Sequence, residues 1–496
     1  MFSFSLLGEA PLRVIEAKEG EVVTSRLLWY NKGEFMRKNL FKNKRITLVG
    51  LGRYPKGSSF SSAEFLLRQG ARVTVVDEKP ASELPAFSMW KKRLPTLTYK
   101  LATYTKADIL SADMILRAPN ILGHHPLLKK ARARKIPIHT DISLFFLAHP
   151  SVDVGITGTR GKSTTSALVA AILRKHWKSV YLGGNISVSP LTFVHKLRSS
   201  SHVILELSSY LTESLQAVHK SPHVACVTNV YRDHLNVHRN FQEYVHAKEE
   251  IFRSQQKNDF CVLNADDREC VRMARSVPSQ VIWFSRSRKN TKQPAVFVEG
   301  LSIVFRDRRG NHAILPTSLI RLRGEHNIAN VCAAVAIATA LHIPNSAIRK
   351  GVASFRGLPH RLEVVANKKN FQCVNDSSST IPDATIAALK SFDEPVILLF
   401  GGNDKKLDFR AAACVIHEHA TYTYILPGTA SSKIKRAFTS VRAPFTSTLS
   451  LADAFSRAVR EHPAGTILLS PGASSFHEFE NEFERGEAFR TLVNTL

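Results

Sequence analysis

One segment of the sequence combines glycines, a lysine and hydroxyl residues in an order that suits phosphate binding. Residues 155–173 read GITGTRGKSTTSALVAAIL, so a short apolar strand turns on glycine into a helix that opens with Lys162, Ser163 and Thr164. Backbone N–H groups of such a turn and helix start bind anions, the lysine adds a positive charge, and a hydroxyl can ligate Mg²⁺. The segment therefore predicts a phosphate site.

The glycine spacing of this segment departs from the standard phosphate loop. That pattern requires a glycine five residues before Gly161, but Ile156 stands there and the glycines are Gly155 and Gly158. Arg160 also lies in the middle of the loop. The strand–turn–helix context still favours a phosphate site over a chance match.

A carboxylate follows an apolar strand soon afterwards, in LELSSYLTESL. The carboxyl ends of parallel strands face the crevice where such sheets bind ligands, so Glu206 is placed to complete a Mg²⁺ shell with a loop hydroxyl and phosphate oxygens. The alternative interpretation is an exposed acid that caps a helix.

Two further polar residues are harder to interpret from their surroundings. In VTNVYRDHLNVH, His234 follows a strand and could ligate a metal or bind substrate, although a single histidine is often structural. Lys248 lies on a helix whose apolar face carries Tyr244, Ile251 and Phe252. Taken alone, a lysine at that position indicates a solvated helix face.

Several later loops carry polar residues at points where a strand or helix begins or ends. Each loop is ordinary by itself. Three of them directly follow apolar strands and so would line one rim of a sheet, namely those in VNDSSST, LLFGGNDKK and LLSPGASS. Their candidate residues are His326, Asn327, Arg361, Asp376, Lys405 and Lys406.

Strands alternate with helical stretches along most of the chain, which predicts an α/β fold with mostly parallel sheets. RITLVGLG and ARVTVVDEKP open a Rossmann-type unit, the phosphate segment opens a second unit, and a third begins after Pro344. The predicted domains are residues 45–150, 151–344 and 345–496, preceded by an extension over residues 1–44 that has no clear periodicity.

Net charge, cysteine spacing and the length of apolar runs indicate which classes of protein the chain can belong to. The charge of +27 is compatible with a nucleic-acid or anionic-membrane partner, or with a solvated basic surface. Six cysteines without a CxxC pair argue against a disulfide framework or a zinc site. The chain shows no apolar run of about 18 residues and no leader peptide, so we expect a cytoplasmic protein.

Taken together and in order, from about residue 45 to 496, these motifs resemble the Mur ligases, ATP-dependent amide-forming enzymes of peptidoglycan precursor synthesis. TGTRGKST is similar to the family's phosphate loop, which has this unusual glycine spacing, with Arg160 in place of an asparagine. The resemblance implies a three-domain architecture: a Rossmann-like UDP-binding domain, a central P-loop-type ATPase domain and a Rossmann-like C-terminal domain that binds the amino acid.

Within the family the chain is most similar to the branch that adds D-glutamate to UDP-N-acetylmuramoyl-L-alanine (UDP-MurNAc-L-alanine). The resemblance then implies ATP and two Mg²⁺ ions, small-molecule substrates, a monomer, and neither a membrane nor a nucleic-acid partner. The tetrapeptide Asp-Asn-Pro-Arg, used by the diaminopimelate- or lysine-adding ligases, is absent from the sequence.

The resemblance also assigns roles by position. The implied ATP contacts are Gly158, Thr159, Gly161, Lys162, Ser163, Thr164, Asn327, Arg361 and Asp376. The implied metal ligands are Ser163, Glu206, His234 and a Lys248 carbamylated by CO₂. The implied catalytic residues are Lys162, Lys248, His234 and Lys405, and the implied substrate contacts are Gly50, Asp77, Asn185, Thr380, Ser475 and Phe483.

Two departures bear on the amino-acid substrate. Ser378 stands where the family often has a lysine near the D-glutamate carboxylates, which Lys405 or Lys406 could replace, and Arg232 stands where an acid is common. The alternatives left open are a relative that adds another amino acid, such as an L-alanine-adding or folylpolyglutamate-type ligase, and a nucleic-acid-stimulated P-loop NTPase.

Overall fold

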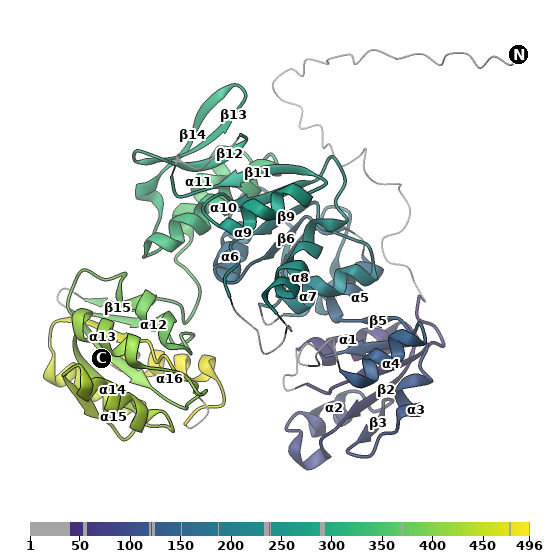
Figure 1. The fold of residues 1–496 in the computed structure, drawn as a ribbon, viewed down its shortest axis with the longest axis horizontal. Helices are drawn as coiled ribbons and strands as arrows, with labels where there is room; N and C mark the ends of the chain where they lie inside the picture. The colour runs from purple at the N-terminus through teal and green to yellow at the C-terminus, as the bar shows by residue number, and fades with distance from the viewer. Residues whose placement is uncertain are drawn as a thin grey trace, which may run out of the picture.

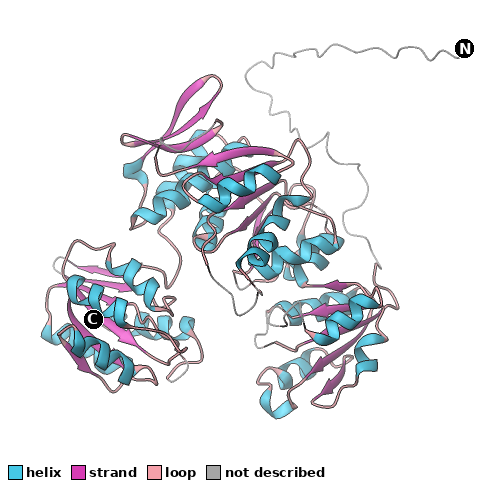
Figure 2. Cartoon of the chain, viewed as in Figure 1, coloured by secondary structure: helices cyan, strands magenta, loops and turns pink. Residues whose placement is uncertain are grey.

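The computed structural model describes residues 40–495 apart from 53–56, 119–120, 122–124, 150, 187, 233–237, 239, 288–292, 369–370 and 476–477. Three β-sheets follow one another along the chain, each covered by helices (Figures 1 and 2). The prediction of an α/β protein with mostly parallel sheets is confirmed.

The first sheet has five parallel strands in the order β3-β2-β1-β4-β5, the arrangement of a Rossmann-type unit. Its strands are β1 (Arg45–Val49), β2 (Arg72–Asp77), β3 (Thr98–Leu101), β4 (Met114–Arg117) and β5 (Ile138–His139). The helices are α1 (Ser58–Arg68), α2 (Phe87–Arg93), α3 (Lys106–Leu110), α4 (Pro126–Ala133) and α5 (Asp141–Ala148). Phe41 precedes β1 but is buried with its ring 6.2 Å from that of Phe65, so this domain starts before residue 45.

The central sheet has nine strands in the order β14-β13-β12-β11-β10-β9-β6-β8-β7. The strands from β6 to β12 run parallel, and β13 and β14 add an antiparallel hairpin at one edge. The strands are β6 (Val154–Thr157), β7 (Val180–Gly184), β8 (His202–Glu206), β9 (Val224–Val227), β10 (Phe260–Asn264), β11 (Gln280–Phe284), β12 (Ala295–Glu299), β13 (Ser302–Asp307) and β14 (Gly310–Pro316).

The α-helices of this unit are α6 (Lys162–Leu173), α7 (Ser209–Glu213), α8 (Phe241–Arg253), α9 (Arg268–Met273), α10 (Glu325–Ala340) and α11 (Asn345–Ser354). Its 3₁₀ turns include η3 (Pro190–Thr192), η4 (Val194–Lys196) and η5 (Ser214–Ala217). Ile348 and Val352 of α11 are buried in the same core as α6 and α10. The predicted boundary after residue 344 is therefore too early, because the apolar face of α11 is buried against the central sheet.

The third sheet has six strands in the order β15-β16-β20-β17-β18-β19, all parallel except β15. The strands are β15 (Glu363–Lys368), β16 (Phe371–Asn375), β17 (Val396–Gly401), β18 (Ala420–Leu426), β19 (Phe445–Ser447) and β20 (Gly465–Leu469). The helices are α12 (Pro382–Leu389), α13 (Arg410–His419), α14 (Ser431–Ser440), α15 (Leu451–Glu461) and α16 (Glu482–Asn494).

The buried apolar residues show how the three units are joined. One cluster runs from the first sheet through α5 to one face of the central sheet, so these two units share a core. The opposite face of the central sheet has its own cluster beneath α6, α10 and α11. The third sheet is packed by two further clusters, both made only of residues from its own domain.

Candidate active site

The predicted phosphate segment folds as a strand, a tight turn and a helix. β6 ends at Thr157, and α6 begins at Lys162 after Gly161, whose φ of 81° lies in the left-handed region. Gly158 has a φ of 147°, and a Cβ there would overlap the Thr228 hydroxyl. Both glycines are therefore required by the turn, which presents the N-terminus of α6.

The turn is held from outside by residues that follow β9. The Asn229 side chain accepts from Arg160 N (2.9 Å) and donates to Arg160 O (3.0 Å), and the Thr228 hydroxyl donates to the same carbonyl at 2.7 Å. These residues fix the backbone at Arg160, whose side chain is exposed. Sequence reasoning missed Thr228 as part of the site, although a polar residue directly after a buried strand was the available signal.

Lys162 lies over the turn that it is predicted to serve. Its Nζ donates to the carbonyl oxygens of Gly158 and Thr159, each at 3.0 Å. Ser163 and Thr164 follow in the first turn of α6 and are half-buried. The predicted ATP residues of this segment therefore lie together, on one loop and one helix start.

Glu206 is brought beside this loop by strand register. It pairs with Ile156 of β6, two residues before Gly158, and its side chain is buried. The Asn185 amide donates to Glu206 Oε1 at 3.1 Å, whereas Oε2 is buried without a hydrogen-bond partner. An exposed helix-capping role is therefore excluded, and the unpaired carboxylate oxygen fits a cation at the edge of the phosphate loop.

The predicted metal site is not marked by a cluster of described acids and histidines. Among the residues that the structure describes, no three His, Cys, Asp or Glu side chains gather as metal ligands would. His234 lies outside the described residues, as does Asp233. The other predicted ligands, Ser163 and Lys248, lie at the phosphate loop, Ser163 in the first turn of α6 and Lys248 with its Nζ on Gly158 O.

Lys248 is buried, with 1% of its surface exposed, so the solvated-face interpretation is wrong. The α8 helix carries it to the phosphate loop, where Nζ donates to Gly158 O at 2.9 Å and lies 4.4 Å from the centre of the Tyr244 ring. The Tyr244 hydroxyl is 2.9 Å from Thr159 Oγ1. Helix α8 therefore packs two polar side chains against the loop.

Asn327 joins helix α10 to the phosphate helix through a second asparagine. Asn327 Oδ1 accepts from Asn330 Nδ2 at 2.9 Å, and Asn330 Oδ1 accepts from Thr165 Oγ1 at 3.4 Å. Asn330 also lies so close to Gly161 that a Cβ there would overlap its Oδ1. Sequence reasoning missed Asn330, whose signal was a second asparagine one turn along an otherwise apolar helix.

Asp376 and Arg361 lie close together in the third domain. The Asp376 carboxylate accepts from the hydroxyls of Ser379 (2.6 Å) and Ser470 (2.7 Å) and from Leu362 N (3.2 Å). Burial raises the pKa of Asp376 to about 6, although these hydrogen bonds and the charge of Arg361 oppose that shift. Because Asp376 holds the backbone next to the exposed Arg361, its contacts position that arginine.

The residues predicted to meet the amino acid lie on loops at the carboxyl edge of the third sheet. Lys405 follows β17 and is exposed, Thr380 follows β16 and is half-buried, and Ser475 follows β20. The Ser475 hydroxyl is buried without a hydrogen-bond partner. Phe483 at the start of α16 is 48% exposed, so its ring is available for contact.

A buried arginine supports the same edge and was missed by sequence reasoning. Arg485 of α16 is 2% exposed, and its guanidinium donates to Ser377 Oγ (3.0 Å) and Ser377 O (2.8 Å). Burial lowers its pKa to about 10. The signal was weak, because an arginine on a polar helix is normally solvated.

In the first domain, the two predicted substrate residues shape one loop. Gly50 follows β1 and donates its N–H to Val76 O at 2.9 Å. Asp77 ends β2, and its carboxylate accepts from Leu51 N (2.9 Å) and Lys79 N (3.0 Å). These contacts form the carboxyl edge of the first sheet, where a Rossmann-type unit binds its ligand.

Known proteins match the chain over nearly its whole length. The model of the Mur ligase middle domain matches residues 156–338. UDP-N-acetylmuramoylalanine–D-glutamate ligase of Roseiflexus sp. (strain RS-1) is 36% identical over 464 residues, covering 91% of this chain and 99% of the relative. The enzyme of the same name from Koribacter versatilis is 35% identical over 462 residues, covering 92% and 98%. The chain belongs to the Mur ligase family.

Solved structures show the same fold. UDP-N-acetylmuramate-alanine ligase MurC of Thermotoga maritima superimposes with a TM-score of 0.57 at 18% identity, covering 91% of this Mur ligase and 100% of that chain. A pseudomurein peptide ligase type C from Methanothermus fervidus gives 0.54 at 19% identity, with the same coverage. These matches confirm the predicted three-domain Mur ligase architecture.

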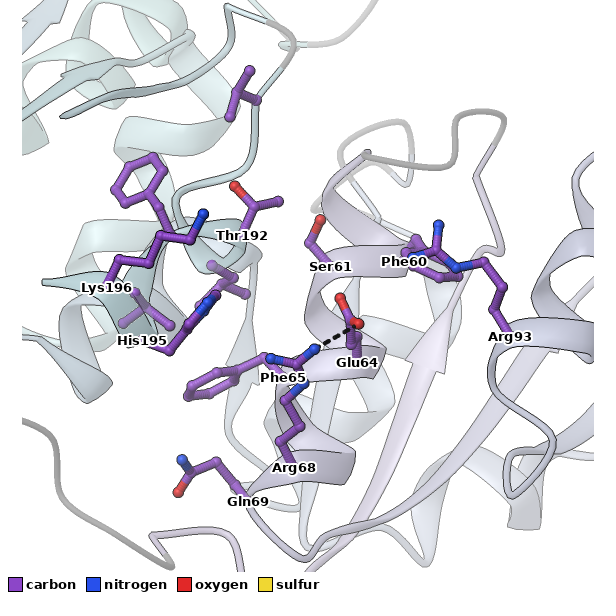
Figure 3. Close-up of a pocket in the computed structure, with 14 residues that line it drawn as sticks. Phe60, Ser61, Glu64, Phe65, Arg68, Gln69, Arg93, Thr192, His195 and Lys196 are labelled. Carbon is purple, nitrogen blue, oxygen red and sulfur yellow. Dashed lines mark hydrogen bonds and ion pairs between the residues drawn. The ribbon is translucent and has the colours of Figure 1, made fainter.

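A hollow of about 410 Å³ in this Mur ligase lies away from the phosphate loop, between the first and central domains (Figure 3). One side is formed by α1, with Phe60, Phe65 and Arg68, and the other by η3 and η4, with Thr192 and Lys196. None of the predicted site residues lines it. This hollow is therefore separate from the predicted phosphate site, which consists of the turn between β6 and α6 and the side chains that contact it.

Proposed function

We propose that this Mur ligase joins D-glutamate to UDP-MurNAc-L-alanine in peptidoglycan precursor synthesis, converting ATP to ADP and phosphate. The observation that carries the proposal is the near-full-length similarity to D-glutamate ligases, together with Glu206 and Lys248 at the phosphate loop. The arrangement suits phosphoryl transfer, and the relatives' names indicate the acceptor and the amino acid.

The chemistry explains why ATP is needed. A carboxylate is a poor acyl donor because its leaving group is very basic, so the γ-phosphoryl group of ATP is first transferred to the L-alanine carboxylate. The D-glutamate amine then attacks the acyl phosphate carbon, and phosphate leaves from the tetrahedral intermediate. Lys162 and the N-terminus of α6 bind the phosphate oxygens and offset the charge that develops on them.

The residues at the loop fit Mg²⁺, and Glu206 with its unpaired oxygen is the main reason. Ser163, Glu206, His234 and a carbamylated Lys248 would hold the ions. Mg²⁺, when bound, neutralises phosphate charge and orients the oxygens for in-line transfer. Asn185 orients the Glu206 carboxylate through its amide hydrogen bond.

The third domain would supply the amino-acid site. Lys405, Ser475 and Phe483 would bind D-glutamate, and Arg361 would reach ATP from the same domain. Closure of this domain would then assemble the centre and exclude water, which would hydrolyse an acyl phosphate. Arg323, which precedes α10, forms an ion pair with Glu394 at 2.9 Å and thereby joins the central and third domains next to Asn327.

The setting of the reaction follows from its substrates. None of the described helices is long and apolar enough to cross a membrane. We infer that the enzyme works in the cytoplasm as a monomer on small, nucleotide-linked substrates.

A phosphate-release assay tests this function. We expect release that requires UDP-MurNAc-L-alanine and D-glutamate together, with L-glutamate, L-alanine and L-lysine giving little, because the relatives are D-glutamate ligases. Product is identified by mass spectrometry. Preference for another amino acid would reassign the chain within the family. Ser378 is the reason to test this, because it stands where the family often has a lysine near the D-glutamate carboxylates. Stimulation by DNA or RNA without the nucleotide substrate would contradict a ligase.

Carbamylation of Lys248 can be tested separately. The neutral amine would attack CO₂, forming an N–C bond and releasing a proton, and the carbamate N–H could still donate to Gly158 O. We expect a mass increase on the peptide that carries Lys248, and activity that falls when CO₂ is removed and returns when it is restored. Lys248→Ala should be inactive under both conditions, whereas Lys257→Ala, at an exposed lysine just after α8, should behave as wild type. An active Lys248→Ala would rule the role out.

A further inference from the structure

A buried carboxylate with no assigned role lies where the first and central domains meet. Asp141 is the first residue of α5 and is 2% exposed. Helix α5 contacts α1 of the first domain and both η3 and η5 of the central domain. Asp141 therefore has neighbours in both domains.

The contacts of this carboxylate are with serines from both domains. The Ser189 hydroxyl donates to Asp141 Oδ2 at 2.8 Å, and the Ser58 hydroxyl lies close enough to the carboxyl to lower its pKa. Asp141 Oδ1 is buried without a hydrogen-bond partner. Burial raises the pKa of Asp141, and both serines act against that shift. A buried acid with incomplete hydrogen bonding costs stability, so packing alone does not account for it.

The two serines belong to the elements that the proposed function assigns to the nucleotide substrate. Ser58 starts α1, the helix that follows β1 and Gly50. Ser189 directly follows a turn closed by Gly184 N donating to Val188 O at 2.7 Å, and this turn carries Asn185. Asn185 in turn holds Glu206. One carboxylate thus joins the first-domain side of the substrate site to the turn beside the metal site.

Helix α1 packs against η3, and their apolar side chains share one buried core, but part of the space between α1 and the η3 and η4 turns is open. Beyond their starts, α1 and the η3 and η4 turns face each other across the hollow of about 410 Å³ (Figure 3). Other polar contacts between the domains lie elsewhere: Thr140 Oγ1 donates to Ser214 Oγ at 2.8 Å, and Arg117 pairs with Glu213 at 3.3 Å. Those contacts hold α7 and η5 rather than the Asn185 turn.

We propose that Asp141 is a positioning residue for the nucleotide-linked substrate, holding α1 and the Asn185 turn at the separation that lets both bind it. This inference rests on the proposed function. It predicts that loss of the carboxylate weakens binding of that substrate and leaves ATP binding unchanged, because the phosphate loop makes none of these contacts.

The test is calorimetric titration of the full chain with UDP-MurNAc-L-alanine and, separately, with ATP. In Asp141→Asn the negative charge is lost, so the Ser189 hydroxyl keeps at most a neutral amide oxygen as its acceptor. We expect the Kd for UDP-MurNAc-L-alanine to rise about tenfold, the change typical of one lost charge-assisted hydrogen bond. The Kd for ATP, measured without Mg²⁺, should stay within about twofold of wild type, because neither Asp141 nor Ser189 contacts the phosphate loop.

Ser189→Ala should raise the Kd by the same factor. The double variant should bind no more weakly than Asp141→Asn alone, because both substitutions act on the same hydrogen bond. Asp153→Asn is the matched control: this acid binds His202 and Val203 N, away from the substrate elements. If both single variants bind UDP-MurNAc-L-alanine as wild type does, or if they lose affinity for ATP equally, the inference about Asp141 is wrong and the proposed function still stands. If wild type does not bind UDP-MurNAc-L-alanine, the proposed function fails as well.

Discussion

Replacement of Lys162 by alanine is expected to lower kcat by about 10³-fold, the effect of removing one preorganised charge from a transition state. Nζ lies over the phosphate turn, within 3.0 Å of two of its carbonyl oxygens. No other described lysine on α6 could replace it, because the next, Lys175, follows the carboxyl end of the helix. The rate of phosphate release with all three substrates measures the effect.

The control for this prediction is Lys175→Ala, which removes an exposed lysine just beyond the same helix and should retain wild-type kcat. Thermal unfolding of both variants should match wild type closely, because Lys162 is half-buried and its removal creates no internal cavity. A Lys162→Ala enzyme with more than about a tenth of wild-type turnover would exclude the assigned charge stabilisation, which requires a far larger loss.

Gly158→Ala is expected to destabilise the protein by roughly 2 to 4 kcal/mol and to abolish ATP binding, since backbone strain and overpacking each cost about 1 to 3 kcal/mol. The new Cβ would overlap the Thr228 hydroxyl, which itself holds Arg160 O, and the φ of 147° is unfavourable for alanine. Relief of the overlap would move the turn that the phosphate needs. Urea denaturation and calorimetric titration with ATP measure the two effects.

Gly300→Ala provides the matched glycine control. Gly300 also has a positive φ, 57°, but a Cβ there would have no atom within 4 Å. We expect it to lose about 1 kcal/mol, the cost of the left-handed conformation alone, with ATP binding intact. Equal losses in the two variants would show that contact with Thr228 has no part in the stability of the loop.

The organisation of the site could be predicted where a local pattern specifies it. The turn into α6 is coded by neighbouring glycines and hydroxyls, and Glu206 follows from the rule that parallel strands end at one edge of a sheet. Lys248 could not be placed in this way. Its burial results from α8 packing against a loop 90 residues earlier in the chain, and helical periodicity carries no information about that contact.

The same limit explains the residues that were missed. Thr228 and Asn330 each act on the turn from a different element, and the pattern of one segment does not show which distant loop its polar side chains reach. The boundary after residue 344 failed for a related reason. A proline ends the helical pattern there, but the destination of the next helix depends on the apolar surface offered by α6, which is far away in the sequence.

The separate cores of the third domain have an evolutionary consequence. Because the apolar clusters of that domain contain none of the residues that pack beneath the phosphate loop, substitutions around Lys405 and Ser475 can accumulate without repacking the core that supports the loop. Effects at such distant, unconnected positions are close to additive. Under the proposed function, selection can therefore vary the loops that meet the amino acid, including the loop that carries Ser378, while the core beneath the phosphate loop is inherited unchanged.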